Sequence, residues 1–259
     1  MRLDKFLSNL KYGTRSEVQS KIKKGFVTVN GVTVKDSKTQ IKPEEDDIII
    51  DGETTYYKKT ILLIMNKPAG YLSTSEIGKQ KTVFELLKEP YNRLSLNIAG
   101  RLDKDTEGLL LFTNDGDLLH NIITPKKHVY KKYYVKTELP FDISNIDKTY
   151  EILDGRDRPY IPLKAIAETI SSNEFYLSIM EGKFHQVKRM VQHFDNEVIY
   201  LKRVSIGKII LDESLQTGEY KEIEDYSIKK RRNYSPFKLS LIISIRVFTA
   251  YWISSNVFW

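Results

Sequence analysis

Residues 100–111 read Gly100-Arg101-Leu102-Asp103-Lys104-Asp105-Thr106-Glu107-Gly108-Leu109-Leu110-Leu111. This stretch is a dense polar loop, with two carboxylates and an arginine, that passes directly into an apolar run. Such a run, bounded by glycine, is typical of a buried strand. The local pattern alone favours turn or capping roles for Asp103 and Asp105 over catalytic ones.

The segments on either side of this loop predict one domain from residue 59 to residue 225. Short apolar runs alternate there with segments of helical spacing. Strands are expected at residues 61–65, 109–112, 133–135, 175–179 and 198–201, and helices at residues 83–88, 117–122 and 185–194. This alternation predicts an α+β fold with a mixed, mainly antiparallel sheet flanked by helices.

A smaller module is expected at residues 1–58, linker included. Apolar residues recur at helical spacing from Leu3 to Leu10, and Thr14 with Glu17 forms a capping-box pattern that starts a second helix. Asn30-Gly31 lies between two alternating segments, which is a strong hairpin signal. A further strand is expected at residues 47–50. Two short helices and a hairpin, with lysines and arginines along them, make a compact basic module.

Composition and charge narrow the classes of protein. The chain has 259 residues and no cysteine, so disulfide scaffolds and thiolate chemistry are excluded, and 41% of its residues are hydrophobic, which excludes a wholly disordered chain. The net charge of +7 is uneven, because residues 1–35 hold eight bases and two acids and residues 226–259 hold six bases and no acid. The long middle is therefore mildly acidic. An affinity for nucleic acid is expected of the N-terminal module and of local patches.

Two further motifs accompany the polar loop. Residues 66–71 (Asn-Lys-Pro-Ala-Gly-Tyr) join a cation to a turn, and residues 181–190 form a glycine turn that enters a basic helix. Such a helix start suits phosphate binding. His185 lies at that start, but a lone histidine there is more often a surface hydrogen-bonding residue than a general base. No spacing of His, Asp and Glu indicates a metal site, and no dinucleotide or P-loop motif is present.

These motifs, in this order, resemble the RsuA/RluB branch of the pseudouridine synthases. The resemblance covers residues 1–225 and is supported by residues 131–135 (Lys-Lys-Tyr-Tyr-Val) and 201–207 (Leu-Lys-Arg-Val-Ser-Ile-Gly). The N-terminal module resembles the alpha-L RNA-binding motif. Residues 181–190 look more like the branch that acts on small-subunit rRNA. The resemblance implies a monomeric, cofactor-free isomerase that converts a uridine of 16S rRNA, free or in an assembly intermediate, to pseudouridine.

The resemblance also implies roles for particular residues. Asp103 matches the family's catalytic aspartate, Tyr133 its active-site tyrosine and Lys188 the basic residue that pairs with the aspartate. Arg101 matches the arginine that helps to hold the target base out of the stack, and Leu201 matches an apolar wall beside that base. Contacts with RNA are further expected from Lys183, Arg189 and Arg203, with Lys202 nearby, and from Arg2, Lys5, Arg15, Lys21 and Lys24 of the N-terminal module.

The chemistry implied by the resemblance suits these residue types. The N1–C1′ bond breaks, the uracil turns and C5 joins C1′, after the base has left its stack at a cost that aromatic stacking and phosphate contacts can offset. An ionised carboxylate can attack the sugar or the base, or accept a proton during glycal formation, and the sequence leaves these routes open. The alternative from another class is a non-catalytic RNA-binding factor of ribosome assembly.

The last segment, residues 226–259, has a different composition. A run of bases precedes 23 residues that are mostly apolar, and both tryptophans of the chain lie in the last eight residues. We expect a non-homologous extension here. An added core helix and a membrane contact remain as alternatives. The N-terminus carries no apolar run typical of a secretory signal, so a cytoplasmic protein is expected.

Overall fold

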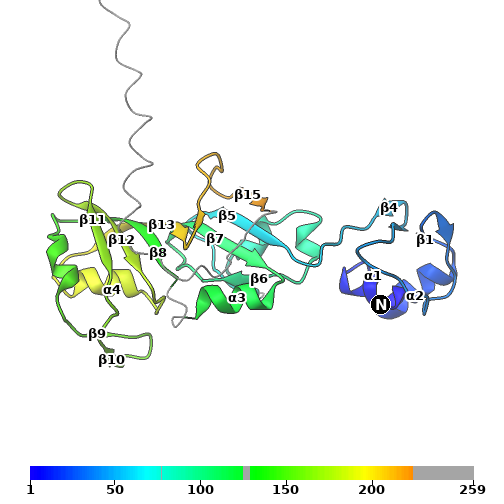
Figure 1. Ribbon diagram of the computed structural model, residues 1–259, viewed down its shortest axis with the longest axis horizontal. Coiled ribbons are helices and arrows are strands. Elements are labelled where there is room, and N and C mark those ends of the chain that lie inside the picture. Colours follow the sequence, from blue (N-terminus) through cyan, green and yellow to red (C-terminus); the bar gives the residue numbers. More distant parts are fainter. Residues whose placement is uncertain (77, 125–128, 224–259) are drawn as a thin grey trace, which may run out of the picture. The chain divides into compact units, whose positions relative to one another are not determined.

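The computed structural model describes residues 1–76, 78–124 and 129–223 (Figure 1). The predicted extension at residues 226–259 lies outside the described residues. Within them, the N-terminal module and the larger domain each have their own hydrophobic core. No helix among the described residues is long and apolar enough to cross a membrane.

The N-terminal module has the two helices and the hairpin that the sequence predicts. Helix α1 spans Leu3–Asn9 and α2 spans Arg15–Lys23. The capping box forms as expected, since the backbone N–H of Thr14 donates to Glu17 at 2.7 Å. Strands β1 (Val27–Val29), β2 (Val32–Thr33), β3 (Ile48–Ile50) and β4 (Glu53–Thr54) form one sheet in the order β2-β1-β3-β4.

The larger domain is built on one mixed sheet with the strand order β11-β12-β8-β13-β7-β5-β15. In addition, β14 pairs with β13 and β6 pairs with β7. Every pairing in it is antiparallel except that of β13 with β7, which confirms a mixed, mainly antiparallel sheet. The strands are β5 (Leu62–Lys67), β6 (Asn97–Ala99), β7 (Glu107–Thr113), β8 (Lys131–Thr137), β11 (Ile166–Thr169), β12 (Glu174–Ile179), β13 (Val198–Ile206), β14 (Ile209–Ile210) and β15 (Tyr220–Glu222). A separate hairpin joins β9 (Ile152–Leu153) to β10 (Pro159–Tyr160).

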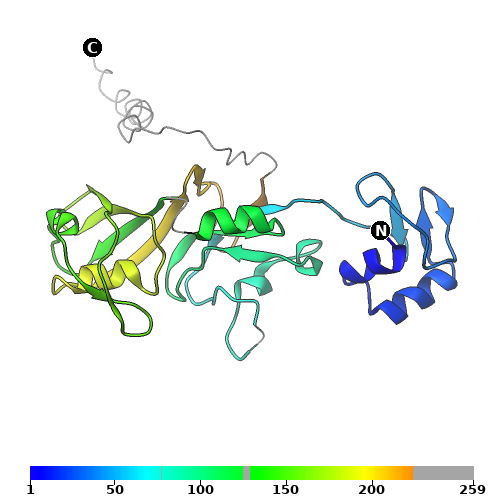
Figure 2. The same ribbon diagram turned by 60° about the horizontal axis from the view of Figure 1, so that its bottom comes forward.

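Two helices accompany this sheet, α3 (Gly116–Ile123) and α4 (Gln186–Gln192), near the positions that the sequence predicts (Figure 2). The helix expected at residues 83–88 is a 3₁₀ turn, Val83–Leu86. It stops early because Leu87 is extended and the N–H of Lys88 donates to the hydroxyl of Tyr220 instead of to a helical carbonyl. Two other 3₁₀ turns span Tyr91–Arg93 and Ile143–Asp147.

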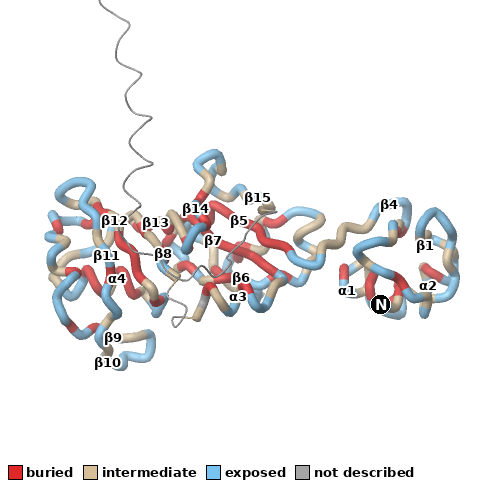
Figure 3. Tube along the Cα trace, viewed as in Figure 1, coloured by how far each residue is buried: buried red, intermediate tan, exposed pale blue. Residues whose placement is uncertain are grey.

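Strands β5 and β7 are buried on both faces (Figure 3). Leu63 and Leu110 belong to the main core on one face, while Leu62 and Leu109 pack with α3 residues on the other. Because successive side chains of a strand alternate between faces, a strand covered on both sides reads as a continuous apolar run. This explains why residues 61–65 and 109–112 were recognisable in the sequence.

The parallel pair β7 and β13 approaches unusually closely at Gly108. Its φ is +96°, and a Cβ added there would lie 2.3 Å from the backbone oxygen of Arg203. Only glycine fits this position without moving one of the two strands. The close approach fixes the point at which the polar loop of residues 100–106 enters the sheet.

We predict that Gly108→Ala destabilises the fold by about 3 kcal/mol or more, because backbone strain at positive φ adds to overpacking against β13. The matched control is Gly218→Ala, whose φ is +91° but whose added Cβ meets nothing within 4 Å. It should cost only about 1–2 kcal/mol. Urea unfolding of both variants measures the difference, and equal losses would contradict the role given to β13.

Candidate active site

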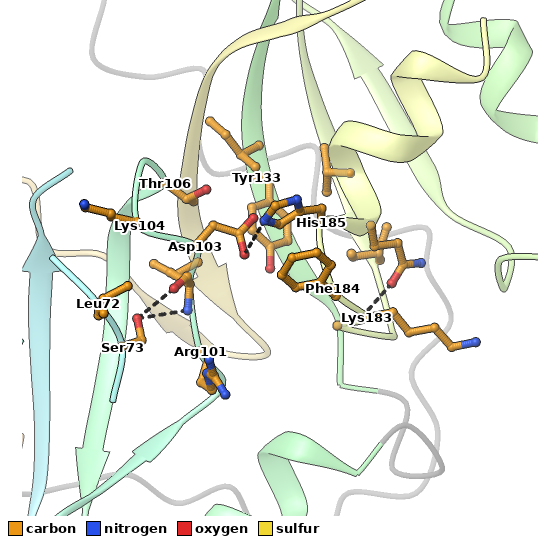
Figure 4. Close-up of a pocket in the computed structure, with 16 residues that line it drawn as sticks. Leu72, Ser73, Arg101, Asp103, Lys104, Thr106, Tyr133, Lys183, Phe184 and His185 are labelled. Carbon is orange, nitrogen blue, oxygen red and sulfur yellow. Dashed lines mark hydrogen bonds and ion pairs between the residues drawn. The ribbon is translucent and has the colours of Figure 1, made fainter. Parts of the chain in front are cut away.

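The largest group of sequence-predicted site residues lines one cavity of about 420 Å³ (Figure 4). The polar loop supplies Arg101 and Asp103, β8 supplies Tyr133, and β13 supplies Leu201. The turn before α4 closes another side with residues 182–187. Segments that are about 100 residues apart in the sequence therefore meet at one site of a size typical for small-molecule and nucleotide pockets.

Two buried cations hold the polar loop in place. The ammonium of Lys67, at the end of β5, donates to the carbonyl oxygens of Pro68 and Thr106 at 2.9 Å each and to that of Lys104 at 3.3 Å. Lys67 is fully buried. Burial lowers the pKa of this lysine to about 8, although nearby carboxylates, Asp105 foremost, oppose the shift.

The second cation is Arg203 of β13. Its guanidinium donates to the backbone oxygen of Leu109 at 2.8 Å, to that of Gly100 at 2.6 Å and to that of Arg101 at 3.3 Å. Only 1% of the residue is exposed. The prediction that Arg203 contacts RNA is wrong, because its donors are committed to the backbone of the polar loop and are buried away from solvent.

Asp103 is half-buried at the pocket, with 26% of its side chain exposed, and it lies between two basic side chains. Its carboxylate lies 3.7 Å from Nε2 of His185 and 3.8 Å from Nζ of Lys188, and Figure 4 shows Asp103 and His185 pointing toward one another. The same lysine makes shorter contacts with Asp105, at 2.6 and 2.7 Å. Lys188 is therefore shared by two carboxylates, and its shorter contacts are not with Asp103 as the sequence predicted.

Asp105 is held ionised by this contact. Partial burial tends to raise the pKa of its carboxyl, but the hydrogen bond and the charge of Lys188 together bring that pKa below its ordinary value. The charge of Lys188 is thus largely balanced by Asp105. A ligand that displaces Asp105, or a rotation of the lysine side chain, would turn this ammonium toward Asp103.

The walls of the pocket are apolar where the sequence predicts an apolar wall. Tyr133 and Leu201 are both 6% exposed and line the cavity. Tyr133 faces the pocket because alternate residues of β8 are buried. A flat base can lie against such walls while polar groups from the loop reach its edge.

The basic residues expected to converge on this site do so only in part. Arg101 and Lys183 are exposed and line the pocket, and Nζ of Lys183 lies 3.2 Å from the ring centre of Tyr160. Lys188 and Arg189 line a second cavity of about 710 Å³. Lys202 follows Leu201 on β13 and so faces the opposite side of the sheet.

The predicted RNA-contacting residues of the N-terminal module differ in their partners. Arg2 and Arg15 both bond the buried carboxylate of Asp4, at 2.8 and 3.1 Å, and Lys21 pairs with Asp51 at 2.6 Å. Burial would raise the pKa of Asp4, but bonds from Gln19, Arg15 and Arg2 hold that pKa far below its ordinary value.

Lys5 and Lys24, the other two predicted contacts of this module, are exposed. Among the residues that the structure describes, neither ammonium has a carboxylate partner. Of the five predicted contacts in this module, Lys5 and Lys24 are therefore the most available to a phosphate.

Sequence reasoning missed three residues of the site. Lys67 was noted only as part of a weak motif, although a lysine that ends an apolar strand is a signal for a buried, paired cation. His185 and Phe184 received no role. His185 has a φ of +53°, and its ring stacks on that of Phe184 with centres 3.7 Å apart. A positive φ outside glycine is uncommon and marks a position held by its surroundings.

The comparisons with known proteins agree with this fold. A family model described as RNA pseudouridylate synthase matches residues 61–193, and one described as S4 domain matches residues 1–48. An RNA pseudouridine synthase of Bacillus subtilis, YtzG, is 44% identical over 230 residues, covering 87% of this chain and 95% of the relative. The ribosomal small subunit pseudouridine synthase A of Haemophilus influenzae is 36% identical, covering 89% and 99%.

Solved structures give the same result. A crystal structure of a pseudouridylate synthase aligns with a TM-score of 0.59 and 35% identity, covering 86% of this chain and 96% of the other. The fold is thus that of an RNA-modifying isomerase with an RNA-binding S4 domain. The chain belongs to the RNA pseudouridylate synthase family, and its predicted resemblance to the RsuA type is confirmed.

No group of three or more His, Asp or Glu that could hold a metal ion occurs among the described residues.

We predict a pH dependence of stability that Lys67 causes. Above about pH 8 the folded chain releases the Lys67 proton, whereas the unfolded chain keeps it up to about pH 10.5. The unfolded state then binds more protons, so the free energy of unfolding contributed by Lys67 rises with pH across this window. Urea unfolding of the wild type and of Lys67→Met from pH 6 to pH 10 measures the difference.

The stability of the wild type relative to Lys67→Met should be flat below pH 7 and increase above pH 8. Lys131, whose pKa burial also lowers to about 8, is present in both proteins and cancels. A constant difference throughout would mean that Lys67 titrates normally in the folded chain.

Proposed function

We propose that this chain converts a uridine of small-subunit ribosomal RNA to pseudouridine, with Asp103 as the catalytic carboxylate. The observation that carries the proposal is the position of Asp103, which lines a pocket with apolar walls and has two basic side chains within 4 Å. The small-subunit substrate is supported by relatives from Haemophilus influenzae and Vibrio cholerae that are named for it.

The pocket suits a flipped uracil. Taking a base out of its stack costs a few kcal/mol, and contact with the aromatic ring of Tyr133 and the apolar side chain of Leu201 offsets part of that cost. Arg101, exposed at the rim, can occupy the space that the base leaves or bind its phosphate. These contacts position C1′ of the sugar and the edge of the base near Asp103.

The isomerisation is balanced without an oxidant or reductant. The N1–C1′ bond breaks, C5 forms the new bond to C1′, the C5 proton leaves and N1 gains a proton. The ionised carboxylate of Asp103 attacks the sugar or the base, or accepts a proton during glycal formation. Tyr133 lines the same pocket, and in this proposal its hydroxyl helps to remove the C5 proton.

The organisation of the chain gives each part a task in this proposal. Residues 1–58 bind phosphates and orient the RNA, and residues 59–225 carry the chemistry. Lysine and arginine contacts to phosphate supply affinity with little sequence information. Choice of the uridine then needs both parts. We place the enzyme in the cytoplasm, acting as a monomer on free 16S rRNA or on an assembly intermediate.

We predict that Asp103→Asn abolishes turnover but keeps the fold and the affinity for RNA, because the amide is isosteric and cannot act as an anionic nucleophile or base. Tritium release from [5-³H]uridine-labelled small-subunit rRNA measures turnover, and filter binding measures affinity. The matched control is Asp105→Asn, which removes the neighbouring carboxylate and leaves Asp103 and Lys188 in place.

Asp105→Asn should retain tritium release. Release from Asp103→Asn would remove this residue from the mechanism. A wild-type chain that binds rRNA tightly but releases no tritium would instead favour the non-catalytic assembly factor.

We predict that the double substitution Lys5→Ala and Lys24→Ala weakens binding to all RNAs by a similar factor, since both exposed ammonium groups are free to meet phosphates. Each lost phosphate contact should reduce the slope of log affinity against log salt by about 0.7–0.9. The control is Lys42→Ala, because Lys42 is exposed in the same module but pairs with Glu45 at 2.8 Å. An unchanged slope in the double variant would exclude these two lysines from the RNA contact.

A further inference from the structure

Phe184, at the rim of the pocket, has no part in the chemistry described above, and its ring forms an aromatic pair with that of His185. Phe184 is 54% exposed, which is high for a large apolar side chain, and it lines the same cavity as Asp103. Figure 4 shows its ring beside the imidazole of His185, across the pocket from Ser73. Exposed aromatic rings that border a polar site are characteristic of surfaces that bind a partner.

The position of this ring is fixed by its neighbours. The His185 ring is stacked on it with an interplanar angle of 18°. The Phe184 side chain also rests on Gly155, where an added Cβ would lie only 2.8 Å from the Cβ of Phe184. Any larger residue at position 155 would displace the Phe184 ring. The ring therefore packs against the backbone of the β9–β10 hairpin.

A cation lies near the Phe184 ring. The guanidinium of Arg189 lies 5.6 Å from the centre of the Phe184 ring, and it is held there by donating to the backbone oxygens of Leu153 and Asp154. Lys183, the residue before Phe184, is also exposed. A flat apolar ring beside a cation matches a nucleotide, which offers a flat base and an anionic phosphate.

We propose that Phe184 and His185 form a stacking site for an unpaired RNA base next to the target uridine. The inference rests on the proposed function, because the pocket that the pair borders is the one assigned to the flipped uracil. Tyr133, Phe184 and His185 line the same cavity, so a neighbouring base can stack on the pair while the uracil lies beside Tyr133. The bound RNA is therefore single-stranded, or is opened, on at least one side of the target.

The test is a binding cycle with synthetic 11-nucleotide RNAs that have one central uridine flanked by adenosines. In further RNAs an abasic residue replaces the adenosine on the 5′ side, the adenosine on the 3′ side, or an adenosine near one end. Fluorescence anisotropy gives the dissociation constants for chains carrying Asp103→Asn, so turnover does not interfere. The chain with Asp103→Asn alone is compared with chains that also carry Phe184→Ala, Phe184→Leu or Phe184→Tyr.

Loss of the stacked base should weaken binding to the Asp103→Asn chain roughly 10- to 100-fold for one flanking position, and not for the position near the end. With the intact RNA, Phe184→Ala and Phe184→Leu should weaken binding by the same factor. With the RNA that lacks the stacked base, these two substitutions should cause no further loss of affinity. Phe184→Tyr, which keeps the ring, should bind like Phe184. Losses that simply add, or a Phe184→Leu chain that binds normally, would overturn the stacking site.

A second readout reports the stacking directly. Replacing the critical adenosine by 2-aminopurine should give fluorescence that is quenched on binding to the chain with Phe184 and unquenched with Phe184→Leu. In the catalytically intact chain, Phe184→Ala should raise KM with little change in kcat, since the contact forms before the chemistry.

The two proposals fail separately. Tritium release by the wild type without coupling in the binding cycle would refute the stacking site and leave the isomerase. Coupling in the cycle without release from any rRNA would refute the isomerase and leave a base-binding site. A control variant, Ile210→Ala, removes an exposed apolar side chain that lines neither cavity and should change neither measurement.

Discussion

Two buried cations that donate to backbone carbonyls hold the loop on which the active site depends. Lys67 binds the loop at residues 104 and 106. Arg203 binds it at residues 100 and 101 and also donates to the backbone oxygen of Leu109 in β7. A buried cation without acceptors is costly, so the loop and the two cations stabilise one another only in this arrangement. Gly108 completes it by letting β7 lie against β13. The carboxylate of Asp103 is therefore placed by bonds from two distant strands.

This scaffold sets the electrostatics of the pocket. Because the loop carries two carboxylates and α4 carries one nearby ammonium, Lys188 is shared, with the shorter contacts going to Asp105. Some of the basic residues hold the structure together, and others remain exposed. Arg203 is fully used by the backbone, and Arg189 is partly used by the β9–β10 hairpin, whereas Arg101 and Lys183 remain exposed.

Local sequence patterns predicted the elements well where the signal was itself local. The capping box at Thr14 and Glu17, the Asn30-Gly31 turn and the two doubly buried strands all formed as expected. The helix at residues 83–88 did not, because a contact with Tyr220, more than 130 residues away, captured the N–H that would have continued it. Arg203 was assigned to RNA because an arginine in a polar-looking segment gives no local sign of burial.

The sequence by itself determined the α+β fold, the S4 domain, the synthase family and the loop that bears Asp103. The signals for these features, namely helix caps, alternating apolar and polar residues, and a compact motif, each span only a few neighbouring residues. Only the tertiary structure decided the burial of Arg203, the sharing of Lys188 and the stacking of Phe184 on His185 over Gly155. The physical reason is that charge pairing and burial depend on which groups meet within about 4 Å. Residues separated by some 30 to 100 positions meet only when the sheet has formed.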